Sequence, residues 1–212
     1  MCFDTDSSFL AWTVSYTISW YLFNRNKNYD RWNAGFILCF STIQLLEAGI
    51  WSIISPTTKD KHGPELNDLL TRLVLIVLLT QPLLQTYLGY RFTGQTILGV
   101  MSFIFLGIIL WAFWRIWTAK PNQFQTHVGS RGHLVWTDSK SSGSLLGPTV
   151  IGVAYIIGLF VPLLFMKGGK GYPLIMIGLI TAAYSLFFTG PGEFGSYWCF
   201  FAVAYAFASL FV

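Results

Sequence analysis

Long runs of apolar residues recur along the chain, separated by short polar segments. These runs predict seven helices that can each cross a bilayer, because a membrane span needs about 20 mainly apolar residues. The expected helices cover residues 7–23, 32–54, 69–90, 96–117, 147–166, 172–190 and 194–212. Pro82 and Pro162 fall inside the third and fifth runs, where we expect them to kink the helices. We therefore expect an all-α fold, an integral membrane seven-helix bundle that forms a single domain over residues 1–212.

The composition of the chain also indicates a lipid environment. The 212 residues are 54% hydrophobic and only 10% charged, with a mean hydropathy of +0.56. Soluble domains carry about 25% charged residues. The net charge of +4 is scattered without a basic run, so nucleic acid is not an expected partner. The expected partner is the lipid bilayer, and a homo-oligomer or a larger assembly is left open.

The charges of the loops predict an orientation in the membrane. Lys and Arg outnumber Asp and Glu in the loops at 24–31, 90–95 and 167–171, which share one side of the predicted bundle. Because loops rich in Lys and Arg stay in the cytoplasm, we expect this side and the C-terminus to be cytoplasmic. The N-terminus and the longer loops at 55–68 and 118–146 are then expected on the outer side.

Glu47 is the most unusual residue, because it is an ionisable side chain inside the second apolar run. Gln44 lies three residues before it, so the two side chains share one face of the helix. An acid in a membrane span is costly and by default marks a functional site. Gln44 and Glu47 are therefore candidates for a polar site that binds a proton or a metal. The alternative is a structural role, in which Glu47 forms an interhelical hydrogen bond, pairs with Arg72 or Arg115, or is held protonated.

The predicted topology gathers candidate metal ligands on the outer side of the bundle. Cys2 precedes the first helix, Cys199 lies in the first turns of the last helix, and His133 lies on the 118–146 loop. Thiolate, imidazole and carboxylate groups bind zinc and other transition metals. The predicted metal ligands are Cys2, Glu47, His133 and Cys199. No local motif such as C-x-x-C supports this set, and a cysteine in an apolar helix is usually a small hydrophobe.

Residues 125–136, within the loop at 118–146, predict a β-hairpin with Gly-Ser-Arg-Gly at its turn. If Val128 pairs with His133, then His127 lies on the opposite face of the hairpin. Only His133 is then expected to fold down over the helices, while His127 stays in water.

Tryptophan and lysine positions bear on the ligands that the bundle can take. Trp51 and Trp136 are candidates for stacking on a ligand, although tryptophans near helix ends more often form an interface belt. The same alternatives apply to a cluster on the fourth helix, formed by Trp111, Trp114 and Trp117 with Arg115. The last run, 194–212, contains no lysine that could form a Schiff base, so retinal is not an expected cofactor.

Several short blocks carry a resemblance to a known family. They are Met1-Cys2-Phe3, Ser8-Phe9, Gln44-Leu45-Leu46-Glu47 with Trp51, Gly132-His133-Leu134-Val135-Trp136 and Trp198-Cys199-Phe200. In these blocks the chain resembles an uncharacterised family of small multi-pass membrane proteins of bacteria and large DNA viruses. That family begins Met-Cys-Phe-Ser, whereas this chain has Asp4 in place of the serine. The resemblance implies a multi-pass membrane fold and no known activity, and its blocks include all four predicted metal ligands.

Three functions follow as alternatives, and the sequence does not decide whether the protein is an enzyme. The first is a polar site near the outer leaflet that binds a metal or a proton. The second is a small-solute or ion transporter or channel that uses Glu47, with Pro82 and Pro162 as hinges. The third is a structural membrane component of a larger assembly or virion. A site capped by the 118–146 loop favours the first function, and a mid-membrane site at a helix break favours the second.

Overall fold

The computed structural model of the protein describes residues 4–54, 63–138 and 150–212. These residues form eight α-helices, two short 3-10 helices and one two-stranded sheet. The α-helices are α1 (Thr5–Arg25), α2 (Asp30–Ile54), α3 (Gly63–Thr93), α4 (Thr96–Trp117), α5 (Val150–Phe160), α6 (Gly171–Phe188), α7 (Phe194–Phe200) and α8 (Ala202–Ser209). The other elements are the strands β1 (Phe124–Val128) and β2 (Leu134–Asp138) and the 3-10 helices η1 (Val161–Phe165) and η2 (Lys167–Gly169). The expectation of an all-α fold is confirmed, and so is the small β-hairpin predicted at residues 125–136.

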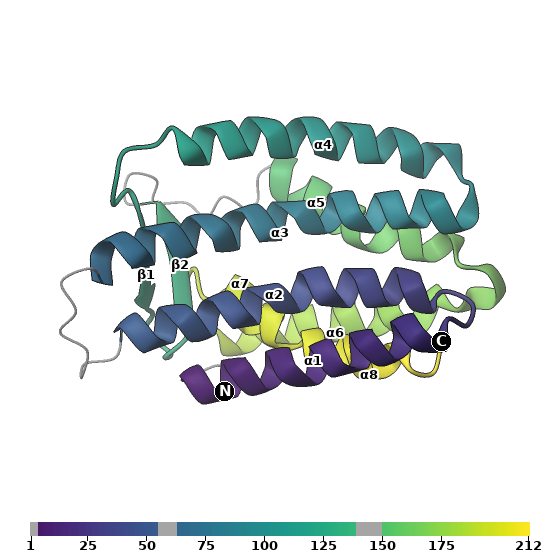
Figure 1. Ribbon diagram of the computed structural model, residues 1–212, viewed down its shortest axis with the longest axis horizontal. Coiled ribbons are helices and arrows are strands. Elements are labelled where there is room, and N and C mark those ends of the chain that lie inside the picture. The colour runs from purple at the N-terminus through teal and green to yellow at the C-terminus, as the bar shows by residue number, and fades with distance from the viewer. Residues whose placement is uncertain (1–3, 55–62, 139–149) are drawn as a thin grey trace.

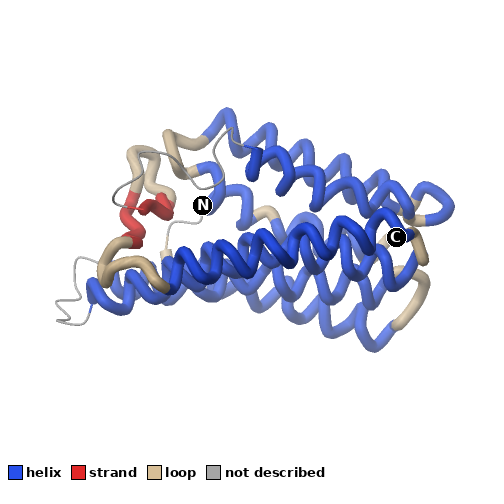
Figure 2. The backbone as a smooth tube through the Cα atoms, turned by 90° about the horizontal axis from the view of Figure 1, so that it is seen from above, coloured by secondary structure: helices blue, strands red, loops and turns tan. Residues whose placement is uncertain are grey.

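The helices run along one long axis, and successive long helices alternate in direction (Figure 1). The hairpin lies at the end of the molecule where α1 begins, and the C-terminus lies at the opposite end (Figures 1 and 2). The turn between α1 and α2, the turn between α3 and α4, and η2 all lie at the C-terminal end. The three positively charged loops therefore share one end of the structure, as the sequence predicts.

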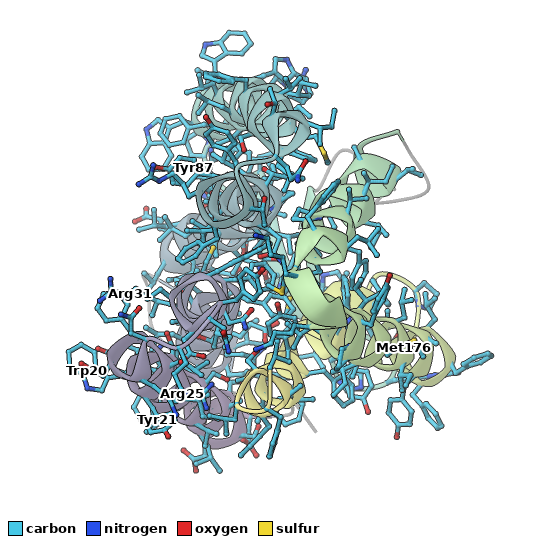
Figure 3. All side chains as sticks on the ribbon, turned by 90° about the vertical axis from the view of Figure 1, so that its right-hand side faces the viewer. Trp20, Tyr21, Arg25, Arg31, Tyr87 and Met176 are labelled. Atoms are coloured by element: carbon cyan, nitrogen blue, oxygen red, sulfur yellow. The ribbon has the colours of Figure 1, made fainter. Side chains whose placement is uncertain are left out.

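Four helices, α2, α3, α4 and α6, are long and apolar enough to cross a membrane. Two shorter apolar segments combine neighbouring elements, α5 with η1 and α7 with α8. Large apolar side chains also lie on the outer surface of the bundle, where Trp20 and Tyr21 point away from α1 (Figure 3). The exposed fractions of these two side chains are 62% and 54%. The surface of the helices is thus as apolar as their sequences predict.

Local sequence signals explain several helix ends. α1 begins after Asp4, whose side chain accepts a hydrogen bond from the Ser7 N–H over 2.7 Å, and it ends at Asn26 with a left-handed φ of 50°. α3 begins at Gly63 rather than at residue 69 as expected. Pro64 and Glu65 account for the earlier start, since proline and acidic residues are both favourable in the first turn of a helix.

Two of the expected helices are divided in the structure. α5 ends at Phe160 and continues as the 3-10 helix η1, because Pro162 has no N–H to donate within a helix. The helix expected at 194–212 consists of α7 and α8, which are separated at Phe201. Pro82, by contrast, lies within the uninterrupted helix α3. The α-helix is therefore interrupted near Pro162, and the kink expected at Pro82 stays a prediction.

α2 lies inside the bundle, where it packs against α1, α3, α7 and α8. Its buried side chains include Trp32, Ile37, Ile43 and Ile50, each with no exposed surface. α4 packs mainly on α3 and leaves most of its surface exposed. The polar residues on the inner face of α2, among them Asn33, Ser41, Gln44 and Glu47, are consequently buried in protein.

Candidate functional site

Glu47 and Gln44 lie side by side on α2 and are completely buried. Their exposed fractions are both 0%, and Gln44 Nε2 donates a hydrogen bond to Glu47 Oε2 over 2.8 Å. Ser196 of α7 also interacts with the Glu47 carboxyl group. Glu47 Oε1 and Ser196 Oγ have no hydrogen-bond partner among the described residues. The site therefore consists of a buried acid, one amide donor and a hydroxyl group.

The two arginines expected as alternative partners of Glu47 are engaged elsewhere. Arg72 Nε donates to Asp68 Oδ2 over 2.7 Å, and the Arg115 guanidinium lies over the ring of Trp111 at 5.6 Å. Neither arginine forms an ion pair with Glu47 in the described part of the chain. The structural ion pair considered from the sequence is thus not formed with these residues.

The hairpin covers the end of the bundle at which α7 begins. Val128 pairs with Leu134, so the register differs by one residue from an alignment of Val128 with His133. His133 precedes β2, is only 3% exposed, and lies with its ring 4.4 Å from that of Tyr197 on α7. His127 is exposed. His133 reaches the helices and His127 does not, because His133 belongs to the turn rather than to the strand.

Glu193 attaches the hairpin to the start of α7. Its buried carboxylate accepts hydrogen bonds from the N–H groups of Arg131 and Gly190, each over 2.8 Å. Gly129 approaches so closely that a Cβ atom there would lie 2.1 Å from Glu193 Oε1. The turn of the hairpin thus requires glycine at position 129 and a carboxylate at position 193.

A second attachment joins the hairpin to α3. Asn67 exchanges two hydrogen bonds with the backbone of Thr126, both over 2.9 Å, and Thr71 hydrogen-bonds to the Thr126 hydroxyl over 2.7 Å. Asp68 Oδ1 accepts a hydrogen bond from the N–H of Phe124 over 2.8 Å. The hairpin is therefore fixed to α3 on one side and to α7 on the other, as a cap over this end of the bundle.

The burial of His133 predicts a pH dependence of stability. Burial lowers the pKa of His133 below its ordinary value of 6.5, and the nearby Glu193 opposes this shift. Below about pH 6.5 the unfolded chain binds more protons at this residue, so the folded state loses stability as the pH falls. We expect thermal unfolding at about pH 7.5 and about pH 5.5 to differ less in His133→Gln than in the wild type.

The exposed His127 provides the matched control for this prediction. His127→Gln changes an exposed side chain of the same hairpin and should keep the pH dependence of the wild type. The same pH dependence in the wild type and in His133→Gln would contradict the prediction.

The structure places three of the four predicted metal ligands. Cys199 is buried close enough to Glu47 for an electrostatic interaction, and His133 lies beside Tyr197. Cys2 lies outside the described residues. Within residues 4–54, 63–138 and 150–212, no three His, Cys, Asp or Glu side chains are grouped to hold a metal ion. Glu47, His133 and Cys199 are thus not grouped as a set of three in these residues, and the metal hypothesis stays a prediction.

The two predicted stacking tryptophans lie on different elements near this site. The ring of Trp136 packs on α7, where a Cβ atom at Gly195 would lie 2.8 Å from it. Trp51 is half-buried on α2, one turn beyond Glu47. The indole N–H groups of both tryptophans are buried and have no hydrogen-bond partner in the part of the chain that the structure describes. A stacking role for these two tryptophans stays a prediction.

A series of buried polar groups that was not predicted from the sequence continues from Glu47 along the bundle. Cys199 interacts electrostatically with both Glu47 and Tyr155. The Tyr155 hydroxyl in turn donates a hydrogen bond to Gln81 Oε1. All four side chains are at most 4% exposed. These buried polar groups thus lie on α2, α7, α5 and α3, and the hydrogen bond between Tyr155 and Gln81 joins the last two helices.

The series continues on α3 towards the C-terminal end of the bundle. One turn after Gln81, the Gln85 side chain accepts a hydrogen bond from Trp32 Nε1 over 2.9 Å and interacts with Tyr205. A cavity of about 20 Å³ beside Gln85 and Tyr205 has room for one water molecule. We call this series the polar file, and its members are Glu47, Cys199, Tyr155, Gln81, Gln85 and Trp32.

The polar file runs lengthwise through the bundle. Its two ends, Trp32 and Glu47, are separated by about 22 Å along α2 at the rise of an α-helix. Gln81 and Gln85 are four residues apart in an apolar run, so they share one face of the helix. Two polar side chains on one face of an apolar run are a signal that could have identified them from the sequence.

Comparisons with family models, with curated proteins and with solved structures find no match to this chain. The resemblance to the family of small membrane proteins that begin Met-Cys-Phe-Ser stays a prediction. Two of its blocks, those that contain Glu47 and His133, both contact α7. The function of the protein is therefore inferred from the geometry of its residues.

Proposed function

We propose that the protein is a multi-pass integral membrane protein with a proton-binding site at Glu47, near the outer leaflet. The four long apolar helices and the exposed aromatic side chains support a lipid environment. The shorter segments α5 with η1 and α7 with α8, together with α1, complete the seven spans. The excess of Lys and Arg at the C-terminal end supports a cytoplasmic location for that end.

The observation that carries the proposal is the complete burial of Glu47 without a cation beside it among the described residues. An ionised carboxylate in such surroundings costs much more free energy than the neutral acid. The neutral acid also supplies an O–H group that can donate to Ser196 Oγ, whereas the carboxylate can only accept. Glu47 accordingly holds a proton and releases it when water or a cation reaches Oε1.

Infrared spectroscopy of the protein in lipid tests this proposal directly, because a protonated carboxyl group and a carboxylate absorb at different frequencies. We expect a buried-acid band in the wild type that titrates with pH and is lost in Glu47→Gln. The control Glu65→Gln, which removes an exposed acid at the start of α3, should keep the band. A band that persists in Glu47→Gln would overturn the assignment of the proton to Glu47.

The polar file favours proton passage through the bundle as a second function. Its buried members and the cavity beside Gln85 offer successive hydrogen-bonding groups along most of a bilayer core, which is about 30 Å thick. In liposomes that contain a pH-sensitive dye, we expect proton flux to be lost in Glu47→Gln and reduced in Gln81→Leu. Glu65→Gln should conduct as the wild type does. Wild-type flux no greater than that of empty liposomes would rule out this second function.

The metal site and the structural role remain further proposals from the sequence. Elemental analysis of the full-length protein, beside Glu47→Gln and His133→Gln, tests the metal site. Stoichiometric zinc or another transition metal that is lost in both variants would support it, since the two residues would then be ligands of one ion. A protein with no metal, no flux and no titrating acid would be assigned to a structural role in an assembly.

A further inference from the structure

A cavity of about 260 Å³ lies where α4 ends and the hairpin begins. Trp111, Arg115 and Thr118 line it from the end of α4, and Gln123 and Phe124 line it from the approach to β1. The lining thus combines two aromatic rings, two uncharged polar groups and one cation. This combination suits a ligand that is partly anionic and partly apolar.

Arg115 supplies the positive charge of the cavity. Its side chain is exposed, lies 5.6 Å from the centre of the Trp111 ring, and forms no ion pair among the described residues. A guanidinium group presents several N–H donors in one plane, which match the oxygens of a phosphate group. Arg115 is therefore able to form a bidentate contact with a phosphate.

Arg72 offsets the partial negative charge at the carboxyl end of α4, which would otherwise repel an anion from the cavity. The carboxyl end of a helix repels anions because its last carbonyl groups carry a partial negative charge. Here Arg72 donates hydrogen bonds to the carbonyl groups of Ile116 and Lys120, the latter over 2.7 Å. The charge of Arg72 is itself balanced by Asp68. Among the residues that the structure describes, Arg115 is thus a charge beside the cavity that has no ion-pair partner.

Three exposed tryptophans mark the depth of the cavity in a bilayer. Trp111, Trp114 and Trp117 occupy the last turns of α4 and are 49%, 61% and 54% exposed. Tryptophan concentrates at the level of the lipid headgroups. A span that ends in these residues would place Arg115 at the depth of the lipid phosphates.

We propose that this cavity binds the phosphate group of an anionic phospholipid. Arg115 contacts the phosphate, and Trp111 and Phe124 contact the glycerol and the upper part of an acyl chain. The inference rests on α4 crossing a bilayer, as proposed above, and it is independent of the proton site at Glu47.

Native mass spectrometry of the full-length protein in a neutral detergent, with added phosphatidylglycerol or phosphatidylcholine, tests the inference. We expect the wild type to retain phosphatidylglycerol in preference to phosphatidylcholine. Arg115→Gln should weaken this binding about tenfold, as expected for one charge-assisted contact, and Arg115→Lys should be intermediate. The control is Arg91→Gln, which changes an exposed arginine in the last turn of α3. This variant should bind phosphatidylglycerol as the wild type does.

Two results would overturn the inference. Equal binding of phosphatidylglycerol by the wild type and Arg115→Gln would remove Arg115 from the site. Displacement of the lipid by inorganic phosphate alone would assign the site to a free phosphate instead of a lipid. Flotation of the protein with vesicles measures membrane insertion separately, so a failed lipid site is distinguished from a failed membrane assignment.

Discussion

Replacement of Arg72 by alanine is expected to lower the free energy of unfolding by about 3–5 kcal/mol. Arg72 and Asp68 are only 6% and 8% exposed, so the variant would leave a buried carboxylate without its cation. The carbonyl groups of Ile116 and Lys120 would also lose their donor. Unfolding of the detergent-solubilised protein by heat or denaturant, followed by circular dichroism, measures the loss.

Two variants serve as controls for the Arg72 prediction. Arg91→Ala removes an exposed arginine from the same helix and should change the free energy of unfolding by no more than about 0.5 kcal/mol. The double variant Asp68→Ala with Arg72→Ala should lose less than the sum of the single losses, because neither charge is left alone. A loss in Arg72→Ala as small as that in Arg91→Ala would refute the role given to Arg72.

Replacement of Glu193 by alanine is expected to lower the free energy of unfolding by about 2–6 kcal/mol, since two N–H groups lose their acceptor at about 1–3 kcal/mol each. The affected groups belong to Arg131 and Gly190, which Glu193 holds together. The hairpin should detach from α7 before the helices unfold. Hydrogen exchange measured by mass spectrometry should therefore increase in residues 124–136.

A graded series tests whether the acceptor atoms of Glu193 are responsible. Glu193→Gln keeps one acceptor oxygen and nearly the same volume, so its loss should be roughly half that of Glu193→Ala. Glu65→Ala removes an exposed acid and should leave the exchange of the hairpin unchanged. Wild-type exchange in Glu193→Ala would show that the hairpin is held by other contacts.

The helices could be predicted where their limits depend on local signals. α4 has the expected range, and α2 begins two residues before the expected 32, because the apolar runs end at charged or turn-forming residues. The break between α7 and α8 at Phe201 has no glycine or proline to mark it. Such a break is set by packing against other helices, which local periodicity does not describe.

The candidate site could be predicted only where it depends on neighbouring residues of one helix. Gln44 and Glu47 are three residues apart on one helix, so their contact follows from helix geometry alone. The contact of Glu47 with Ser196 depends on how α2 and α7 are rotated about their axes. Runs that are apolar on every side leave this rotation undetermined, so the polar file could not be assembled from the sequence.

The attachment of the hairpin to α3 has a consequence for the order of events during synthesis. Asn67, Asp68 and Thr71 are made with α3, but their partners on β1 follow 55 to 59 residues later. While the ribosome completes α4, the polar start of α3 must remain in water or in contact with the insertion machinery. In a chain inserted as proposed, emergence of β1 would give these groups their partners together, whereas the attachment of the hairpin to Glu193 would have to wait for α7.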